Sequence, residues 1–281
     1  MANVTWTITQ RRRLKELGIE LENRPDSFSN TSERNKLFQQ FEKQQVEKRK
    51  KQLTAVLENG GRVALEDLTE KLTAALCKIG FIRVTTPTVI SKSSLIKMTI
   101  DEDHPLNHQI YWLNSKQCLR PMLAPNLYSL MSDFSRIRHR PICFFEIGSC
   151  FRKESDGAKH NSEFTMLNLV EMGTPKDERL HRLKELASLV SRTAGLTDYQ
   201  FESEKSKIYG TTIDVIAGSE NIEVASGAIG PHPLDIAWGV TDTWVGLGFG
   251  LERLLMTQTG EKSIGRCGKS LSHINGIHLK L

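Results

Sequence analysis

The sequence lacks a long hydrophobic run, a paired-cysteine motif and an internal repeat. No stretch of about 18 apolar residues occurs in the 281-residue chain, and the N-terminus has no signal-peptide pattern, so we expect no membrane partner. The cysteines are odd in number and form no CxxC pair, which argues against a disulfide framework and against a zinc site. Free thiols are typical of the reducing cytoplasm, where we expect this protein to act.

Basic residues exceed acidic ones only near the N-terminus. Residues 1–52 hold 12 Lys and Arg against 7 Asp and Glu, a net charge of +5, whereas the rest of the chain holds 26 of each. The surplus gathers in "QRRRLKELG" (10–18) and "QQVEKRKKQL" (44–53). Such a run is either a solvated helical face or a surface for a polyanion such as RNA, because clustered Lys and Arg displace counterions from phosphates.

The residue pattern changes near residue 60. Residues 1–60 are expected to form a basic helical segment with a break around 23–30, and the Gly pair in "ENGG" ends it. Over 63–80 leucines recur at helical spacing, with a Gly as the C-terminal cap. We therefore expect a second domain over 61–281.

Strand-like segments dominate this second domain. A strand is expected over 81–90, interrupted by Pro87, and helices over about 125–138, over 176–194 and from Leu251. Several strands follow one another without a helix long enough for a parallel crossover. We therefore expect an α+β fold in which helices flank an antiparallel β-sheet. The other expected strands are 108–113, 117–122, 142–154, 163–172, 209–216, 221–230 and 244–250.

The segment "CFRKESDGAKHNSEF" (150–164) places charges between two strands. Because side chains alternate faces, Arg152 and Glu154 share a face, and a hairpin would bring Phe164 to the same end. Arg152 could clamp a phosphate and Phe164 could stack on a purine. Glu154 could accept from an exocyclic amine, and His160 could reach outer phosphates. An Arg–Glu ion pair beside a core Phe would give the same pattern.

Two later segments add small residues and a carboxylate. In "WVGLGFGLERLL" (244–255), Gly at alternate positions leaves one strand face bare for a flat ligand, with Arg253 at the start of the next helix. Close packing of a helix would also explain these glycines. In "NIEVASGAIGP" (221–231), Glu223 and Ser226 could hold Mg²⁺ together with phosphate oxygens, because Mg²⁺ needs few protein ligands.

Taken in order, these segments resemble the three motifs of class II aminoacyl-tRNA synthetases. The helix and strand ending at Pro87 resemble the first motif, which builds the dimer interface of that family. "FRKE…HNSEF" resembles the second motif and "GLGFGLER" the third. Further similarity, in "LRPMLAPNLYSLM", "FEIGSCFRKESDG", "EFTMLNLVEMG" and "GFGLERLL", points to the catalytic domain of the pyrrolysyl-tRNA synthetase family. One departure is Lys269, where the family pattern suggests Arg.

The resemblance implies an ATP- and Mg²⁺-dependent ligase that activates pyrrolysine as an aminoacyl-adenylate and transfers it to its cognate tRNA. It implies a homodimer and a tRNA-binding role for the basic segment. The chain lacks the extra N-terminal RNA-binding domain of the family's long forms, which leaves room for a separate tRNA-binding protein. The implied catalytic residues are Arg152, Glu154 and Arg253; His160, Phe164, Glu223 and Ser226 would also bind ATP, with Glu223 and Ser226 on the metal.

The resemblance also implies an amino-acid pocket. Its one polar group, Asn168, suits the amide carbonyl of pyrrolysine, whose ring needs an apolar cavity. Two alternatives remain open: a synthetase for another large apolar amino acid, such as a phenylalanyl type, and a catalytically silent RNA-binding relative. From the helix pattern alone, Leu127, Tyr128 and Met131 would be interpreted as core residues of the expected helix. The implied pocket is Ala124, Leu127, Tyr128, Met131, Asn168, Val170 and Trp244, with Tyr209 on a mobile lid.

Overall fold

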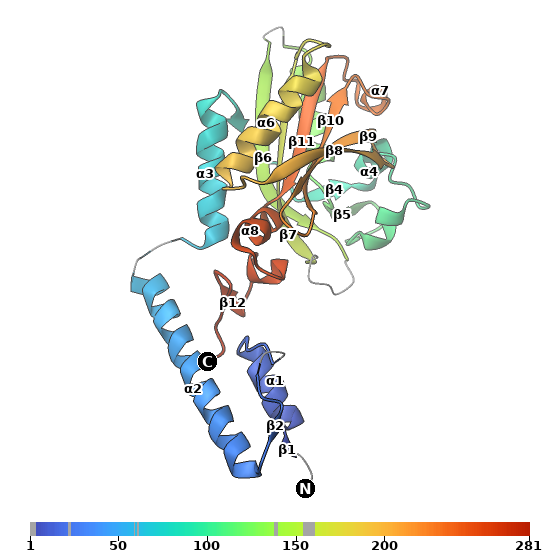
Figure 1. Cartoon of the computed structure of the whole chain (residues 1–281). Coiled ribbons are helices and arrows are strands. Elements are labelled where there is room, and N and C mark those ends of the chain that lie inside the picture. The colour runs from blue at the N-terminus through green and yellow to red at the C-terminus, as the bar shows by residue number, and fades with distance from the viewer. Residues whose placement is uncertain (1–3, 22–23, 59, 61, 138–139, 154–160) are drawn as a thin grey trace. The chain divides into compact units, whose positions relative to one another are not determined.

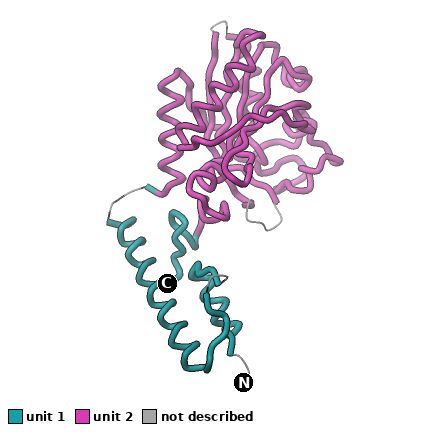
Figure 2. The backbone as a smooth tube through the Cα atoms, in the orientation of Figure 1, with its two compact units in different colours: residues 1–62, 271–281 teal, residues 63–270 magenta. Residues whose placement is uncertain are grey.

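The computed structural model describes residues 4–21, 24–58, 60, 62–137, 140–153 and 161–281. The chain forms two compact units, one of residues 1–62 with Leu271–Leu281 and one of Val63–Ser270 (Figure 2). The expected change near residue 60 lies close to this division, but no sequence pattern indicated that the last residues belong with the first unit. None of the helices within the described ranges is long and apolar enough to cross a membrane.

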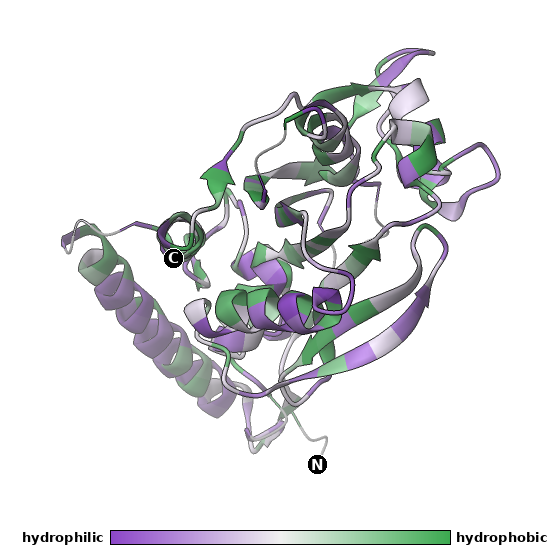
Figure 3. Ribbon diagram, turned by 90° about the horizontal axis from the view of Figure 1, so that it is seen from above, coloured by the Kyte–Doolittle hydropathy of each residue, from purple (hydrophilic) through white to green (hydrophobic). Residues whose placement is uncertain are grey.

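The first unit is built around the long helix α2. A buried cluster that includes Trp6, Leu14 and Phe28 packs beneath it. No residue of α2 itself is buried, and most of its residues are hydrophilic (Figure 3). A break separates the two helices, as expected. The short β1–β2 pairing was not expected. The elements are β1 (Val4–Thr5), α1 (Ile8–Glu16), β2 (Ser27–Phe28), α2 (Thr31–Glu58), β12 (His273–Ile274) and β13 (Ile277–His278).

A seven-stranded sheet organises the second unit, in the order β3-β6-β7-β11-β10-β9-β8 (Figure 1). All neighbours pair antiparallel except β3 with β6, which are parallel. This confirms the α+β fold with a mainly antiparallel sheet flanked by helices. The sheet strands are β3 (Ile82–Arg83), β6 (Ile142–Phe151), β7 (Glu163–Met172), β8 (Tyr199–Ser206), β9 (Gly210–Ala217), β10 (Ile222–Gly230) and β11 (Trp244–Gly250).

The two faces of this sheet carry different hydrophobic clusters. Helices α3 (Ala64–Lys78), α6 (Arg179–Thr193) and α8 (Leu251–Thr259) bury most of their leucines on one face. The other face packs against α4 (Lys92–Lys97), α5 (Ala124–Phe134) and α7 (Asp235–Trp238), with the short pair β4 (Val89–Ser91) and β5 (Gln117–Leu119) beside them. Alternation along each strand sends successive side chains to opposite clusters.

Two expected elements differ from the structure, and one strand was not expected. The expected strand over 108–113 is wrong: it overlaps the 3₁₀ helix η1 (Pro105–Gln109), because Pro105 fixes the first turn and the His104 side chain accepts from the Leu106 N–H. Helix α5 ends at Phe134, short of the expected 138. The edge strand β8 was missed because its sequence, YQFESEKS, is mostly charged and polar.

Candidate active site

A cavity of about 280 Å³ lies on the sheet face opposite α3 and α6. Strands β7, β10 and β11 form its floor, and helix α5 forms one wall. The sequence-predicted site residues among the described ones all line it. They are Ala124, Leu127, Tyr128, Met131, Arg152, Phe164, Asn168, Val170, Tyr209, Glu223, Ser226, Trp244 and Arg253. Glu154 and His160 lie outside the described residues.

The floor follows from the alternation of two strands. Along β7, Phe164, Asn168 and Val170 line the cavity, while the intervening Leu167 enters the helix-covered core. Strand β11 pairs with β7 and has glycines at the cavity-facing positions. A Cβ on Gly248 would lie 3.2 Å from the Asn168 amide nitrogen. The bare strand face predicted from the glycine spacing is therefore present, and it makes room for Asn168.

The strand register orders the cavity from a charged end to an apolar end. Met166, next to Phe164 on the same face, pairs with Gly250, from which α8 and Arg253 continue. Further along, Val170 pairs with Gly246, and Met172 pairs with Trp244. Arg152 and Arg253 therefore lie at one end of β7 and Trp244 at the other, so the two predicted subsites adjoin along one strand.

Both arginines at the charged end are held by main-chain carbonyls. Arg152 Nε donates to the Pro121 oxygen at 2.9 Å, and its guanidinium lies over the Phe164 ring, 5.2 Å from the centroid. Arg253 donates to the Glu223 carbonyl oxygen at 3.1 Å. The alternative of a simple Arg–Glu pair involves Glu154, which is outside the described residues. Both arginines also line the cavity, where a guanidinium can bind an anionic ligand through paired N–H donors.

Glu223 and Ser226 stand close to Asp214, which the sequence analysis missed. Ser226 Oγ donates to Asp214 at 2.6 Å across the β9–β10 pair. Desolvation by the surrounding protein raises the pKa of the Glu223 carboxyl; Asp214 adds to this rise, and Arg253 opposes it. Within the described part of the chain, no three His, Cys, Asp or Glu side chains gather to hold a metal alone. Oxygen ligands in this number fit Mg²⁺, which completes its shell with phosphate oxygens and water.

The apolar end is lined by aromatic and aliphatic side chains with one amide. Tyr128 stacks on Trp238 at 5.6 Å between ring centroids and meets Trp244 edge to face at 5.8 Å. Asn168 is the amide, and its Oδ1 is buried without a hydrogen-bond partner among the described residues. An orphaned polar atom in an apolar wall is unfavourable unless a ligand satisfies the group.

Tyr128 and Tyr209 both reach this end as neutral phenols. Burial raises the pKa of Tyr128, and the charges of Tyr209 and Asp235 raise it further. Burial and Asp235 likewise raise the pKa of Tyr209. Asp235 Oδ2 accepts from Trp244 Nε1 at 3.0 Å, which fixes the indole wall. A Cβ on Gly230 would lie 1.9 Å from that Nε1, so only glycine lets the indole lie there.

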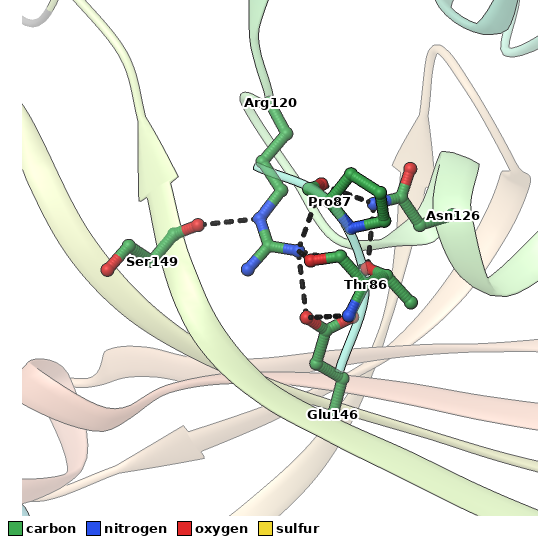
Figure 4. Close-up of polar contacts among 6 residues, drawn as sticks. All are labelled: Thr86, Pro87, Arg120, Asn126, Glu146 and Ser149. Atoms are coloured by element: carbon green, nitrogen blue, oxygen red, sulfur yellow. Dashed lines mark hydrogen bonds and ion pairs between the residues drawn. The ribbon is translucent and has the colours of Figure 1, made fainter. Parts of the chain in front are cut away.

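A buried ion pair holds helix α5 to the sheet (Figure 4). Arg120 and Glu146 are 3% and 1% exposed, and their charged atoms are 2.8 Å apart. Glu146 also accepts from the Thr86 hydroxyl at 2.6 Å, and Asn126 of α5 donates to that hydroxyl at 2.7 Å. A Cβ on Gly148 would lie 2.2 Å from Arg120, so glycine is required for the arginine to pass. No sequence pattern indicated this network.

A second buried carboxylate supports the charged end. Both carboxylate oxygens of Glu252 accept from the Thr165 N–H, at 2.8 and 2.9 Å, and burial raises the pKa of this group. Lys269 forms an ion pair with Glu163, which lowers the pKa of Glu163. Lys269, which stands where the family pattern suggests Arg, therefore binds a carboxylate on β7.

Several cavity residues were not predicted as site residues. Met166 could have been, because alternation places it on the Phe164 face. Asn161 comes from a loop and Ile264 from the short 3₁₀ helix η2 (Ile264–Arg266), and neither segment has a periodicity to follow in the sequence. The full set of such side chains is Met122, Asn161, Met166, Leu169, Thr212, Val224, Ala225, Ala228, Leu247, Glu252 and Ile264.

Comparison with known proteins agrees with this geometry. The sequence profile described as "tRNA synthetases class II core domain (F)" matches residues 49–268. The crystal structure of pyrrolysyl-tRNA synthetase from Desulfitobacterium hafniense is 49% identical, covering 99% of both chains with a TM-score of 0.87. A structure of Desulfitobacterium hafniense PylSc, a pyrrolysyl tRNA synthetase, is 47% identical, covering 99% of this chain and 98% of that one with a TM-score of 0.86. This chain belongs to the class II aminoacyl-tRNA synthetases, in the pyrrolysyl-tRNA synthetase family.

Proposed function

We propose that the protein is an ATP-dependent ligase that charges its cognate tRNA with pyrrolysine, acting in the cytoplasm. One observation supports it most: a single cavity is lined by two arginines at one end and by an apolar wall with Asn168 at the other, and the Asn168 Oδ1 has no hydrogen-bond partner among the described residues. The charged end suits ATP, and the apolar end suits a long side chain with one internal amide. Asn168, Trp244 and Tyr128 would bind that side chain, with Ala124, Leu127, Met131, Val170 and Tyr209 around it.

The first step joins the two substrates of this cavity. A carboxylate oxygen of the amino acid attacks the α-phosphorus of ATP, the bond to the β-phosphate oxygen breaks, and pyrophosphate leaves. A carboxylate is already deprotonated at neutral pH, so no general base is required. Arg152 and Arg253 would align the phosphates and offset the charge that develops on them, while Phe164 would stack on the adenine. A tRNA ribose hydroxyl then attacks the acyl carbon and AMP leaves.

Mg²⁺ fits the charged end. Glu223 and Ser226 would hold it, with Asp214 positioning the serine hydroxyl. The ion would supply charge neutralisation for the triphosphate. Glu154 and His160 stay predicted ATP ligands, because they lie outside the described residues.

Amino-acid-dependent ATP–pyrophosphate exchange tests this proposal. Pyrrolysine, phenylalanine and lysine are compared at equal concentration with the purified chain. We expect exchange with pyrrolysine alone, since a lysine ammonium would be poorly solvated in the apolar end and phenylalanine would leave Asn168 unpaired. Exchange with phenylalanine would favour the phenylalanyl alternative. No exchange in a folded, ATP-binding protein would favour a silent relative.

The basic N-terminal segment is proposed to bind the tRNA body. Arg13 is unsuited to testing this, because it pairs with Glu42 at 2.7 Å and so links α1 to α2. Lys48 and Lys51 are exposed on α2. Their replacement by Glu should raise the KM for tRNA about tenfold and leave pyrophosphate exchange unchanged. The control, Lys116→Glu with Lys176→Glu, makes the same charge change on the second unit; equal effects there would contradict the proposal.

The homodimer is proposed from the first family motif. The sheet edge near β3 exposes apolar side chains, with Ile82 67% and Ile137 48% accessible. They border a small apolar depression with Val84 and Phe134. A second copy would cover such a surface, and Ile82→Glu should yield a monomer in sedimentation.

A separate tRNA-binding protein stays a prediction. Binding of tRNA by this chain alone at nanomolar concentration would make such a partner unnecessary.

A further inference from the structure

Tyr209 is held through its backbone at the end of the β8–β9 hairpin. Its N–H donates to Ser206 Oγ at 3.2 Å, as does the N–H of Ile208. On the other side, the Tyr209 carbonyl lies 2.9 Å from His232 Nε2. Both main-chain polar groups of Tyr209 therefore have partners, and the ring is directed into the cavity. Of these contacts, only the one with His232 crosses to another part of the chain.

The neighbours of His232 determine its tautomer. Nδ1 accepts from the Leu234 N–H at 3.2 Å, so the ring proton must be on Nε2, the atom that faces the Tyr209 carbonyl. The two rings also meet edge to face, 5.6 Å apart. His232 is thus a donor fixed toward one carbonyl.

The turn that carries His232 is tied to the amino-acid pocket. The backbone N–H of His232 donates to Asp235 Oδ2 at 2.7 Å. The same carboxylate oxygen accepts from Trp244 Nε1 at 3.0 Å. Asp235 therefore joins the wall of the pocket to the turn, and His232 joins the turn to Tyr209. The chain of contacts runs from one side of the apolar end to the other.

We propose that His232 is a positioning residue that latches Tyr209 over the amino-acid pocket and thereby sets the affinity for the amino acid. The latch is a single hydrogen bond between turns that lie far apart in the sequence. It closes the pocket without touching the ATP end. This inference deepens the proposed function and rests on it for the identity of the substrate.

Three substitutions separate the latch from the local role of His232. His232→Asn keeps an acceptor for the Leu234 N–H but is too short to reach Tyr209. His232→Gln places an amide donor near the position of Nε2. His232→Leu removes both bonds. His181→Ala is the matched control, because His181 lies exposed on α6 and pairs only with neighbouring Glu185 among the described contacts.

The amide hydrogen-exchange rate of residues 206–211 in the ligand-free protein directly measures how often the latch opens. We expect several-fold faster exchange there in the Asn and Leu variants, and near-normal exchange in the Gln variant and in the control. In pyrophosphate exchange, Asn and Leu should raise the KM for pyrrolysine about three- to tenfold, with the KM for ATP unchanged and with rescue by Gln.

The outcomes separate the latch from the proposed function. Unchanged amide hydrogen exchange of residues 206–211 in both the His232→Asn and the His232→Leu variant would overturn the latch. Faster amide hydrogen exchange with an unchanged KM for pyrrolysine would overturn the role of the latch in amino-acid affinity. If the wild-type protein shows no activity with pyrrolysine while the Asn variant still opens the hairpin, the proposed function fails and the latch stands.

Discussion

The two ends of the cavity are built by different means. At the charged end, Arg152 and Arg253 are fixed by carbonyl oxygens of other segments. At the apolar end, packing of Tyr128 against Trp238 and Trp244 sets the shape, and Asn168 Oδ1 has no hydrogen-bond partner within the described part of the chain. We therefore expect the first end, which depends on charge, to tolerate little change, and the second, which depends on volume, to tolerate more.

The difference has a physical basis. Stabilising developing charge requires donors aimed before the reaction starts, and a misplaced guanidinium loses most of its effect. An apolar wall discriminates only weakly, by about 1–3 kcal/mol for each methylene gained or lost. We therefore expect specificity at the apolar end to come from its polar groups, Asn168 above all, and from closure of the pocket by Tyr209.

Removal of an arginine at the charged end should give the largest effect. Arg253→Ala is expected to lower kcat for pyrophosphate exchange about 10³-fold, because the charge on the phosphates loses a fixed partner. Arg253→Lys keeps the charge without the planar fork and should recover part of the loss. The control is Arg192→Ala, an exposed arginine on α6. A loss below about tenfold for Arg253→Ala would contradict the role given to this end.

The buried Arg120–Glu146 pair should affect stability rather than the binding of either substrate. Arg120→Met leaves the Glu146 carboxylate buried without its partner, so the free energy of unfolding should fall by about 3–5 kcal/mol. Arg120→Met with Glu146→Leu should recover most of this loss. Arg136→Met removes an exposed pair with Asp133 and should change stability by less than about 1 kcal/mol. Urea unfolding followed by circular dichroism measures all three.

A pair of substitutions at Asn168 should affect the apolar end alone. Asn168→Ala is expected to lower kcat/KM for pyrrolysine about 10- to 100-fold, with the KM for ATP unchanged. Asn168→Leu, of similar size but without the amide, should lose pyrrolysine and gain phenylalanine in the same assay. An equal rise in the KM for ATP would show that the two ends are not separable.

Local patterns predicted much of the sheet and the floor of the site. Alternation placed Phe164, Asn168 and Val170 on one face, and glycine spacing gave the bare face of β11; both features follow from the two-residue repeat of a strand. The antiparallel sheet followed from the lack of crossover helices. These properties need no knowledge of which segments meet.

Contacts between distant segments could not be predicted in the same way. Arg120 meets Glu146, and His232 meets Tyr209, only because the sheet and its turns bring them together, and no periodicity links such positions. Strand β8 was missed because an edge strand has one solvated face and carries charges there. The apolar pocket residues came from family resemblance, since on α5 alone they match a core helix.

The pH dependence of the charged end should give the smallest effect and the sharpest contrast with the apolar end. Desolvation raises the pKa of Glu223, so this carboxyl takes up a proton at a higher pH than an ordinary glutamate does. On acidification, Mg²⁺ should therefore be lost early, and exchange activity should fall severalfold at low Mg²⁺. Saturating Mg²⁺ competes with the proton and should move this fall to lower pH. The KM for pyrrolysine at saturating ATP and Mg²⁺ should change little across the same range, because the pKa values of Tyr128 and Tyr209 are raised further above it. An acid limb of the pH–rate profile that does not move with Mg²⁺ would remove Glu223 from the metal site.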